Sequence, residues 1–285
     1  MDSSLTLTVA QSEAWQHAAL ILAKKIGVGS KKSNAELKSL LLNFGSIQKL
    51  YDYHFSMIPP DSDIVSKLDK IFSSLKVNFG VINCLDDNYP DLLQDIYGAP
   101  PVLYYRGDIN ILKLPRSISF VGTRNLDNPE HITQSLNALE RLVKAGFQVI
   151  VSGLAKGSDT LGHQTAIKLG AKTIAVLGNP INISYPAENK NLQELIAKEH
   201  LVLSEYPVGI LSQGSYFANR NLTTVSLSRE GVVVARAGDK SGTQYAIRTC
   251  VEQNKTVYAL ENNIHEPEYQ WVHKYKKSIK VVKDR

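Results

Sequence analysis

The first 75 residues carry apolar positions with helical spacing. Polar breaks at residues 27–34 and at Pro59–Pro60 divide this stretch into several helices. The apolar residues recur three and four positions apart, as on one face of a helix: Ala18, Leu20, Leu22, Leu37, Leu40, Leu41, Ile64, Leu68, Ile71 and Leu75. We predict a small helical domain over residues 1–77.

Residues 78–114 lack this helical spacing and instead contain short extended segments and prolines at 90, 100 and 101. We interpret them as a linker with one or two strands. Residues 115–261 then alternate between helical segments and six β-branched runs about 25 to 30 residues apart: ISFV, QVIV, TIAV, LVLS, VVVA and TVYAL. Such spacing predicts βαβ units and a doubly wound parallel sheet buried on both faces. Residues 262–285 are predicted to be a basic tail.

Composition narrows the class of protein only slightly. The 285 residues are 43% hydrophobic, enough for one large and one small domain. No apolar run reaches 18 residues, and residues 1–4 do not resemble a signal peptide, so we expect a soluble, cytoplasmic protein. Cys84 and Cys250 have neither disulfide nor metal-ligand spacing, and we expect both to be buried. The net charge of +5 favours a polyanionic partner without identifying one.

Ligands of a doubly wound sheet bind at the carboxyl ends of its strands, where helix N-termini favour anions. The loop after the first run is GTRN, in which Gly122 permits a close backbone approach and Arg124 suits a phosphate or, equally, a surface ion pair. The second run leads into SGLAKGSD, where Gly153 and Gly157 bracket Lys156 before a helix. This second loop is the strongest candidate for an anion cradle.

Two later loops add further candidates. Phe217 lies close to Arg220 in SYFANRN, a combination that suits base stacking and phosphate neutralisation, although such an aromatic more often anchors a loop. Lys240 precedes Ser241-Gly242-Thr243 at a predicted helix start. We expect Arg124, Lys156, Arg220 and Lys240 to lie on one rim of the sheet, where a row of cations suits a chain of phosphates.

Patterns typical of catalysis and of cofactor binding are missing. The first loop lacks G-x-G-x-x-G and the second run ends without an acid, which disfavours NAD, and no Walker A, G-x-S-x-G or H-E-x-x-H motif occurs. Asp159 and His163 lie four residues apart, but no nucleophile completes a triad. We therefore expect no enzyme, no cofactor and no metal site.

The ordered motifs of residues 89–261 resemble those of the DNA-processing protein A family (DprA, also called Smf). They run from YPDLLQDIYGAPPVLYYRGD through GTRN, SGLAKGSD, VLGNPINISYPAEN, LSEYP, GSYFANRN and KSGT. The resemblance implies an extended Rossmann-like domain that binds single-stranded DNA, forms a homodimer and loads the RecA recombinase during natural transformation. The N-terminal helices resemble the family's helical domain of the SAM or helix-hairpin-helix kind, in which the turn 27–29 would contact a phosphate.

The resemblance also implies which residues contact DNA. These fall on the family's two phosphate loops, on its F-x-x-R-N-R segment and on its K-S-G-S loop: Gly122, Thr123, Arg124, Gly153, Lys156, Gly157, Phe217, Arg220, Asn221, Lys240, Ser241, Gly242 and Thr243. Asp159 also falls on the second phosphate loop. Leu222 stands where the family has the last arginine of R-N-R, so one expected cation is missing. A C-terminal winged-helix domain, frequent in the family, is not expected.

Three hypotheses for function follow from these patterns. The first is a DNA-binding, RecA-loading protein without catalysis. The second is a sensor or enzyme for a free nucleotide or nucleotide derivative bound in the same cradle, since fold does not fix function. The third is a protein-interaction adaptor that has lost DNA binding.

Overall fold

The computed structural model describes residues 6–283, so the signal-peptide argument, which concerned residues 1–4, lies outside the described chain. Two compact units divide these residues. The first comprises the described chain up to Arg106 with Leu177–Ile183 and Leu203–Phe217, and the second comprises Gly107–Val176, Ser184–Val202 and the described chain from Ala218 onward. In the described part of the chain, no helix combines the length and the apolar character needed to cross a membrane.

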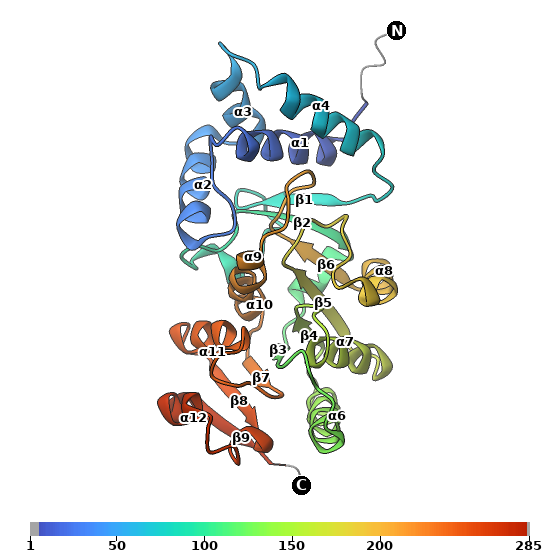
Figure 1. Cartoon of the computed structure of the whole chain (residues 1–285), viewed down its shortest axis with the longest axis vertical. Coiled ribbons are helices and arrows are strands. Elements are labelled where there is room, and N and C mark those ends of the chain that lie inside the picture. Colours follow the sequence, from blue (N-terminus) through green and yellow to red (C-terminus); the bar gives the residue numbers. More distant parts are fainter. Residues whose placement is uncertain (1–5, 284–285) are drawn as a thin grey trace. The chain divides into compact units, whose positions relative to one another are not determined.

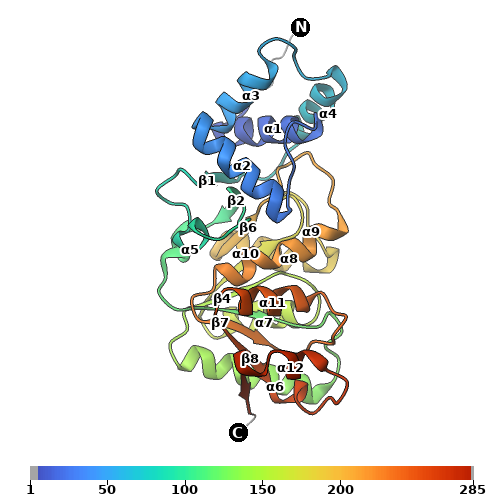
Figure 2. The ribbon, with the colours of Figure 1, turned by 90° about the vertical axis from the view of Figure 1, so that its left-hand side faces the viewer.

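The first unit begins with four helices that pack on one another, coloured blue to teal in Figure 2. Side chains of Thr8, Ser30, Ser46 and Asp61 cap their N-termini, as expected where short polar residues precede an apolar-periodic stretch. The helices are α1 (Val9–Leu22), α2 (Lys31–Phe44), α3 (Ile47–Phe55) and α4 (Ser62–Ser73).

The turn at residues 27–29, which precedes α2, packs against the rest of this unit. Gly29 has a φ of +78° and is buried, and a Cβ atom at this position would lie 2.8 Å from Cε1 of Tyr206. Close packing against Tyr206 thus explains the glycine without a bound phosphate. A DNA contact at this turn stays a prediction.

The predicted parallel α/β architecture is confirmed. All six β-branched runs form strands, and nine strands form one sheet in the order β1-β2-β6-β5-β4-β3-β7-β8-β9 (Figure 1). Only β1 and β2 pair antiparallel among the registers described. The strands are β1 (Gly80–Asn83), β2 (Val102–Gly107), β3 (Ser117–Val121), β4 (Val149–Ser152), β5 (Lys172–Leu177), β6 (Leu201–Ser204), β7 (Gly231–Val234), β8 (Thr256–Leu260) and β9 (Ile279–Val282).

Helices cover both faces of the sheet in the second unit, with α6 and α7 on one face and α11 and α12 on the other (Figure 1). Two short helices, α9 and α10, precede β7. The helices after α4 are α5 (Asp91–Gln94), α6 (Pro129–Lys144), α7 (Ser158–Lys168), α8 (Lys190–Glu199), α9 (Gly214–Asn219), α10 (Asn221–Ser226), α11 (Thr243–Glu252) and α12 (Gln270–Lys274).

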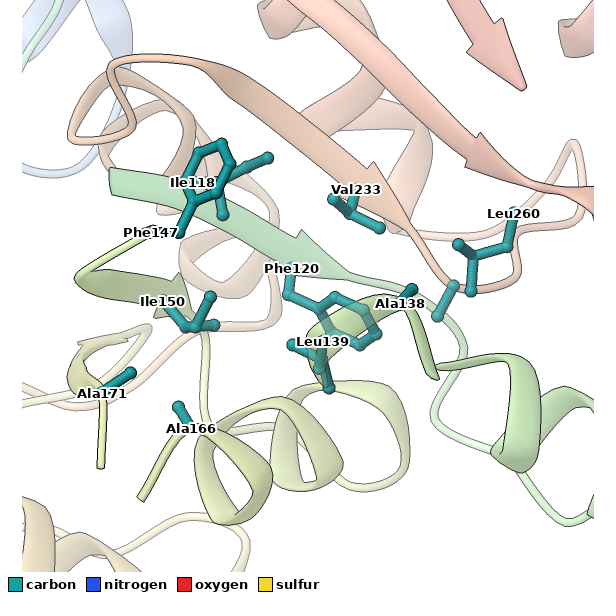
Figure 3. Packing of buried hydrophobic residues seen from close by; sticks show 11 residues of the cluster. Ile118, Phe120, Ala138, Leu139, Phe147, Ile150, Ala166, Ala171, Val233 and Leu260 are labelled. Atoms are coloured by element: carbon teal, nitrogen blue, oxygen red, sulfur yellow. The ribbon is translucent and has the colours of Figure 1, made fainter. Parts of the chain in front are cut away.

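Strand alternation divides the buried side chains of the second unit between these two faces. Phe120 of β3 packs toward Leu139 of α6, whereas Val121 packs on the opposite face with residues of α11 (Figure 3). Both faces are apolar, which explains why these strands read as continuous hydrophobic runs. Cys84 and Cys250 are buried and free, as expected.

Two segments belong to the sheet although the sequence did not indicate it. Residues 78–114, interpreted as a linker with one or two strands, contain β1 and β2, and both strands join the sheet. Residues 262–285, interpreted as a basic tail, contain α12 and β9, and β9 pairs parallel with β8. The four-residue strand Ile279–Val282 follows three basic residues in Lys274–Lys277 and contains Lys280, so its apolar signal was hidden by its charges.

Candidate nucleic-acid interface

The candidate site lies where three neighbouring strands of the second unit end. Strands β4, β3 and β7 are adjacent and parallel, so the loops that follow them reach the same edge of the sheet. From β3 the chain winds to β4 on one side and later returns to β7 on the other, which makes this the topological switch point of the sheet. Ligands of doubly wound sheets bind at such a point. We call the three loops, residues 122–125, 153–157 and 240–243, the strand-end site.

The backbone of the first loop bonds to residues that adjoin the other two loops in sequence. The Thr123 N–H donates to the Arg236 carbonyl at 2.8 Å, and the Thr123 carbonyl accepts from both the N–H and the hydroxyl of Ser158 at 3.0 Å. Gly122 abuts Ser158, where a Cβ atom would clash with the hydroxyl. The Arg124 side chain is exposed, and no hydrogen bond or ion pair holds it among the described residues.

The second loop requires glycine at Gly157. Its φ is +71°, and a Cβ atom would lie 2.6 Å from the carbonyl oxygens of Thr123 and Arg124. Gly157 is the N-cap of α7 and supplies no side chain to the helix N-terminus. The N–H groups of Lys156 and Gly157 have no acceptor within the described chain, so this loop can offer two donors to an anion.

Lys156 is exposed and forms an ion pair with Glu188, which precedes α8. This carboxylate was not singled out from the sequence, because nothing in a sequence pairs residues 32 positions apart in irregular segments. An exposed ion pair contributes little free energy, so a phosphate could compete with Glu188 for this lysine.

The third loop is tied to the first loop and to α10. The Thr243 hydroxyl donates to the Gly122 carbonyl at 3.1 Å, and the Asn221 side-chain amide donates to the Gly242 carbonyl at 3.2 Å. Helix α11 starts after Gly242 without a side-chain cap. In the described chain the N–H groups of Gly242 and Thr243 have no acceptor, and the exposed Lys240 ammonium has no carboxylate partner.

Asp239 and Arg236, both missed by sequence reasoning, fix the segment before this loop. The Asp239 carboxylate accepts the N–H groups of Gln270 and Trp271, each at 2.9 Å, at the start of α12. The Arg236 guanidinium pairs with Glu266 at 2.6 Å. Asp239 directly precedes a predicted site residue, but its partners lie 31 and 32 residues further along the chain, where no helix was predicted.

Arg220 is buried, with 4% of its surface exposed. Its guanidinium donates to the Val176 carbonyl and abuts Gly153, where any Cβ atom would clash with it. Burial raises the pKa of Asp159, and the positive charge of Arg220 opposes that rise. Arg220 therefore supports the second loop from beneath, and direct contact between Arg220 and DNA stays a prediction.

Leu222 is also buried, with 8% exposed. The position where the family pattern has the last arginine of R-N-R thus lies in the interior of this chain rather than on its surface. The apolar side chain suits that environment, and the exposed cations of the strand-end site are unaffected by it.

Phe217 belongs to the first compact unit. It is half-buried, and its ring lies against Gly178, where a Cβ atom would be 2.6 Å from the ring carbon Cδ1. This contact fits the interpretation that the aromatic anchors its loop. Base stacking by Phe217 stays a prediction.

The remaining polar cluster beneath the loops is buried. His163 lies in α7 with no exposed surface, and burial lowers its pKa to about 3. Thr173 donates its hydroxyl proton to the Ile150 carbonyl, so it accepts a hydrogen bond from Nδ1 of His163 at 2.6 Å. Among the described residues, no three His, Cys, Asp or Glu side chains gather as a metal site would require.

The fold and the strand-end site define a doubly wound α/β protein whose loops at the switch point present exposed cations and backbone N–H donors. Comparison with known sequences makes the assignment specific: the chain belongs to the family of DNA recombination-mediator protein A, whose model matches residues 80–280. The family assignment made from the ordered motifs is therefore confirmed.

Three curated relatives illustrate the similarity. The chain is 39% identical over 189 residues to DNA processing protein DprA of Streptococcus pneumoniae, 40% over 192 residues to protein Smf of Synechocystis, and 37% over 179 residues to DprA of Bacillus subtilis. These matches cover 65%, 66% and 63% of this chain, and 64%, 46% and 59% of the respective relatives. The chain thus spans about half to two thirds of those proteins.

Two solved structures share the fold. The crystal structure of S. pneumoniae DprA aligns with a TM-score of 0.71 and 27% identity, over 97% of this chain and 95% of that one. A Helicobacter pylori DprA structure, solved to explain how that protein binds single-stranded DNA, aligns with a TM-score of 0.63 and 26% identity over 72% of this chain and 91% of that one. The fold of this chain is therefore that of the family.

Proposed function

We propose that this protein binds single-stranded DNA at the strand-end site and acts without catalytic turnover. The observation that carries the proposal is the group of four backbone N–H donors, at Lys156, Gly157, Gly242 and Thr243, beside the exposed cations Arg124 and Lys240. Donors and cations in this arrangement suit phosphates. The family assignment favours a nucleic acid as the source of those phosphates, and so does the single-stranded DNA binding of the H. pylori relative.

The binding test uses a fluorescent oligo-dT and the variants Arg124→Ala and Lys240→Ala. Each substitution removes one phosphate contact, so each should weaken binding about tenfold at low salt. Each should also reduce the slope of log affinity against log salt by about 0.7, because fewer counterions are released.

The matched control for this test is Lys198→Ala. Lys198 is also exposed but lies in the last turn of α8, just before β6, where strands begin rather than end. The Lys198→Ala variant should bind oligo-dT with the affinity and the salt slope of the wild type. Wild-type affinity in both Arg124→Ala and Lys240→Ala would show that DNA does not bind here.

We further propose that the bound strand is passed to RecA, that the protein is a homodimer and that it works in the cytoplasm. These points rest on the resemblance to the DprA family. In the presence of the wild-type protein, RecA should coat a long single strand faster, and the Arg124→Ala, Lys240→Ala double variant should lose this effect. If the wild type binds DNA but does not accelerate RecA, the RecA proposal fails while the DNA-binding proposal stands. Light scattering checks the dimer.

A further inference from the structure

An exposed aromatic side chain stands beside the third loop of the strand-end site. Tyr245 lies in the first turn of α11, and 49% of its surface is exposed. Its N–H donates to the Gly242 carbonyl at 3.2 Å. Thr243, Ala246 and Ile247 face the core, so Tyr245 is on the opposite face of this helix and does not anchor it.

Arg248 shares this exposed face, three residues further along α11. Its guanidinium carbon lies 5.8 Å from the centre of the Tyr245 ring, within the range of a cation–π contact. The structure gives Arg248 no hydrogen bond and no ion pair elsewhere in the described chain. The pair therefore presents an aromatic face and a cation to solvent.

The position of the pair relates it to the third loop. Long side chains on a helix lean toward its N-terminus, so a residue covers the turn that precedes its own Cα. For Tyr245 that turn begins at Ser241 and Gly242, where the N–H groups of Gly242 and Thr243 lack acceptors among residues 6–283. A nucleotide whose phosphate meets these donors would have its base within reach of the ring.

We propose that Tyr245 and Arg248 form a stacking platform for the base whose phosphate is held by residues 240–243. The ligand is a nucleotide unit of single-stranded DNA, and stacking accepts any base because every base has a π-face. This proposal rests on the proposed function, since it places a base next to a phosphate site. It assigns a role to an exposed tyrosine and to an arginine that forms no ion pair in the described chain.

The experiment compares oligo-dT with an abasic oligomer of equal length, which keeps the phosphates and lacks the bases. In the Tyr245→Leu variant, oligo-dT should bind about fivefold to about a hundredfold more weakly, the range expected for one lost stacking contact. Affinity for the abasic oligomer should stay within about twofold of the wild type, and the salt slope should be unchanged because no cation is removed.

Three further variants sharpen the test. Tyr245→Phe keeps the ring and should bind oligo-dT like the wild type. Tyr245→Trp should show fluorescence quenching with oligo-dT but not with the abasic oligomer. Tyr97→Leu, which alters a tyrosine that is 69% exposed in the first unit, serves as the control and should change neither affinity.

The outcomes separate this proposal from the proposed function. If the wild type binds neither oligomer, the proposed function fails. If the wild type binds oligo-dT and Tyr245→Leu binds it equally well, or if the substitution weakens both oligomers to the same extent, the stacking platform is wrong while the phosphate site stands. A contact of Tyr245 with another protein would give the first of these two results.

Discussion

Gly157 shows how a single residue shapes the strand-end site. Its φ of +71° with a ψ of −118° belongs to a region that side chains strongly disfavour, and it brings two loops into backbone contact. The glycine pattern in the sequence indicated a tight turn. That this turn also meets the carbonyls of Thr123 and Arg124 is known only from the structure.

Replacing Gly157 with alanine should lower the free energy of unfolding by about 1–3 kcal/mol, because the new Cβ imposes backbone strain. Urea unfolding measures the change. Gly242→Ala is the matched control, since no atom lies within 4 Å of a Cβ there and its φ is −60°. Equal stability of the two variants would contradict the strain argument.

His163 predicts how stability depends on pH. Burial lowers its pKa from 6.5 to about 3, so the unfolded chain binds a proton more readily than the folded one between these values. The stabilisation is complete above about pH 6.5 and is lost as the pH falls toward 3, by at most about 1.4 kcal/mol per pH unit for one histidine. His17, whose pKa is lowered in the same way, should add to the effect.

The test is urea unfolding between pH 7.5 and pH 5 for the wild type and for His163→Gln. The variant should lose less stability over this range than the wild type does. His265→Gln, which alters an exposed histidine, should behave like the wild type. An identical pH dependence in His163→Gln and the wild type would show that His163 is not held neutral.

At the scale of elements, α12 depends on a cap from a distant loop. Two of its N–H groups are bound by Asp239 rather than by the residue before the helix. Asp239→Ala should therefore destabilise the protein by about 0.5–2 kcal/mol, as expected for the loss of a capping carboxylate. Hydrogen exchange of the Gln270 and Trp271 amides should accelerate as well.

Asp127→Ala is the control for this cap, because Asp127 is exposed and no hydrogen bond holds its carboxylate in the described chain. It should leave stability and exchange unchanged. Protected α12 amides in Asp239→Ala would mean that packing of the buried Trp271, and not the cap, holds the helix.

The elements also show where sequence patterns suffice. All six predicted strands of residues 115–261 form, because buried parallel strands need continuous apolar runs. Strands β1, β2 and β9 were not recognised as parts of the sheet. They lie between prolines or basic residues, and pairing with a neighbouring strand, which a local pattern does not record, stabilises them.

For the whole molecule, the decisive comparison is between one nucleotide and several. Neighbouring strands lie about 4.8 Å apart, so loops on three of them span about 10 Å, more than one phosphate occupies. Affinity for oligo-dT should thus rise with length over the first several nucleotides, and mononucleotides should bind weakly in calorimetry. Tight mononucleotide binding without length dependence would instead identify a nucleotide sensor or enzyme, and absence of both would favour the adaptor.

The sequence by itself determined the fold class, the family and the loops that form the candidate site. Strand periodicity, glycine spacing and motif order are properties of the sequence itself, so they can be recognised without a structure. The tertiary structure alone decided which of those residues face solvent. Arg220 and Leu222 are buried, and Lys156 forms an ion pair with Glu188. Arg124 and Lys240 are exposed beside N–H groups that have no acceptor in the part of the chain that the structure describes. Burial and pairing depend on chain segments far apart in sequence, and only folding brings those segments together.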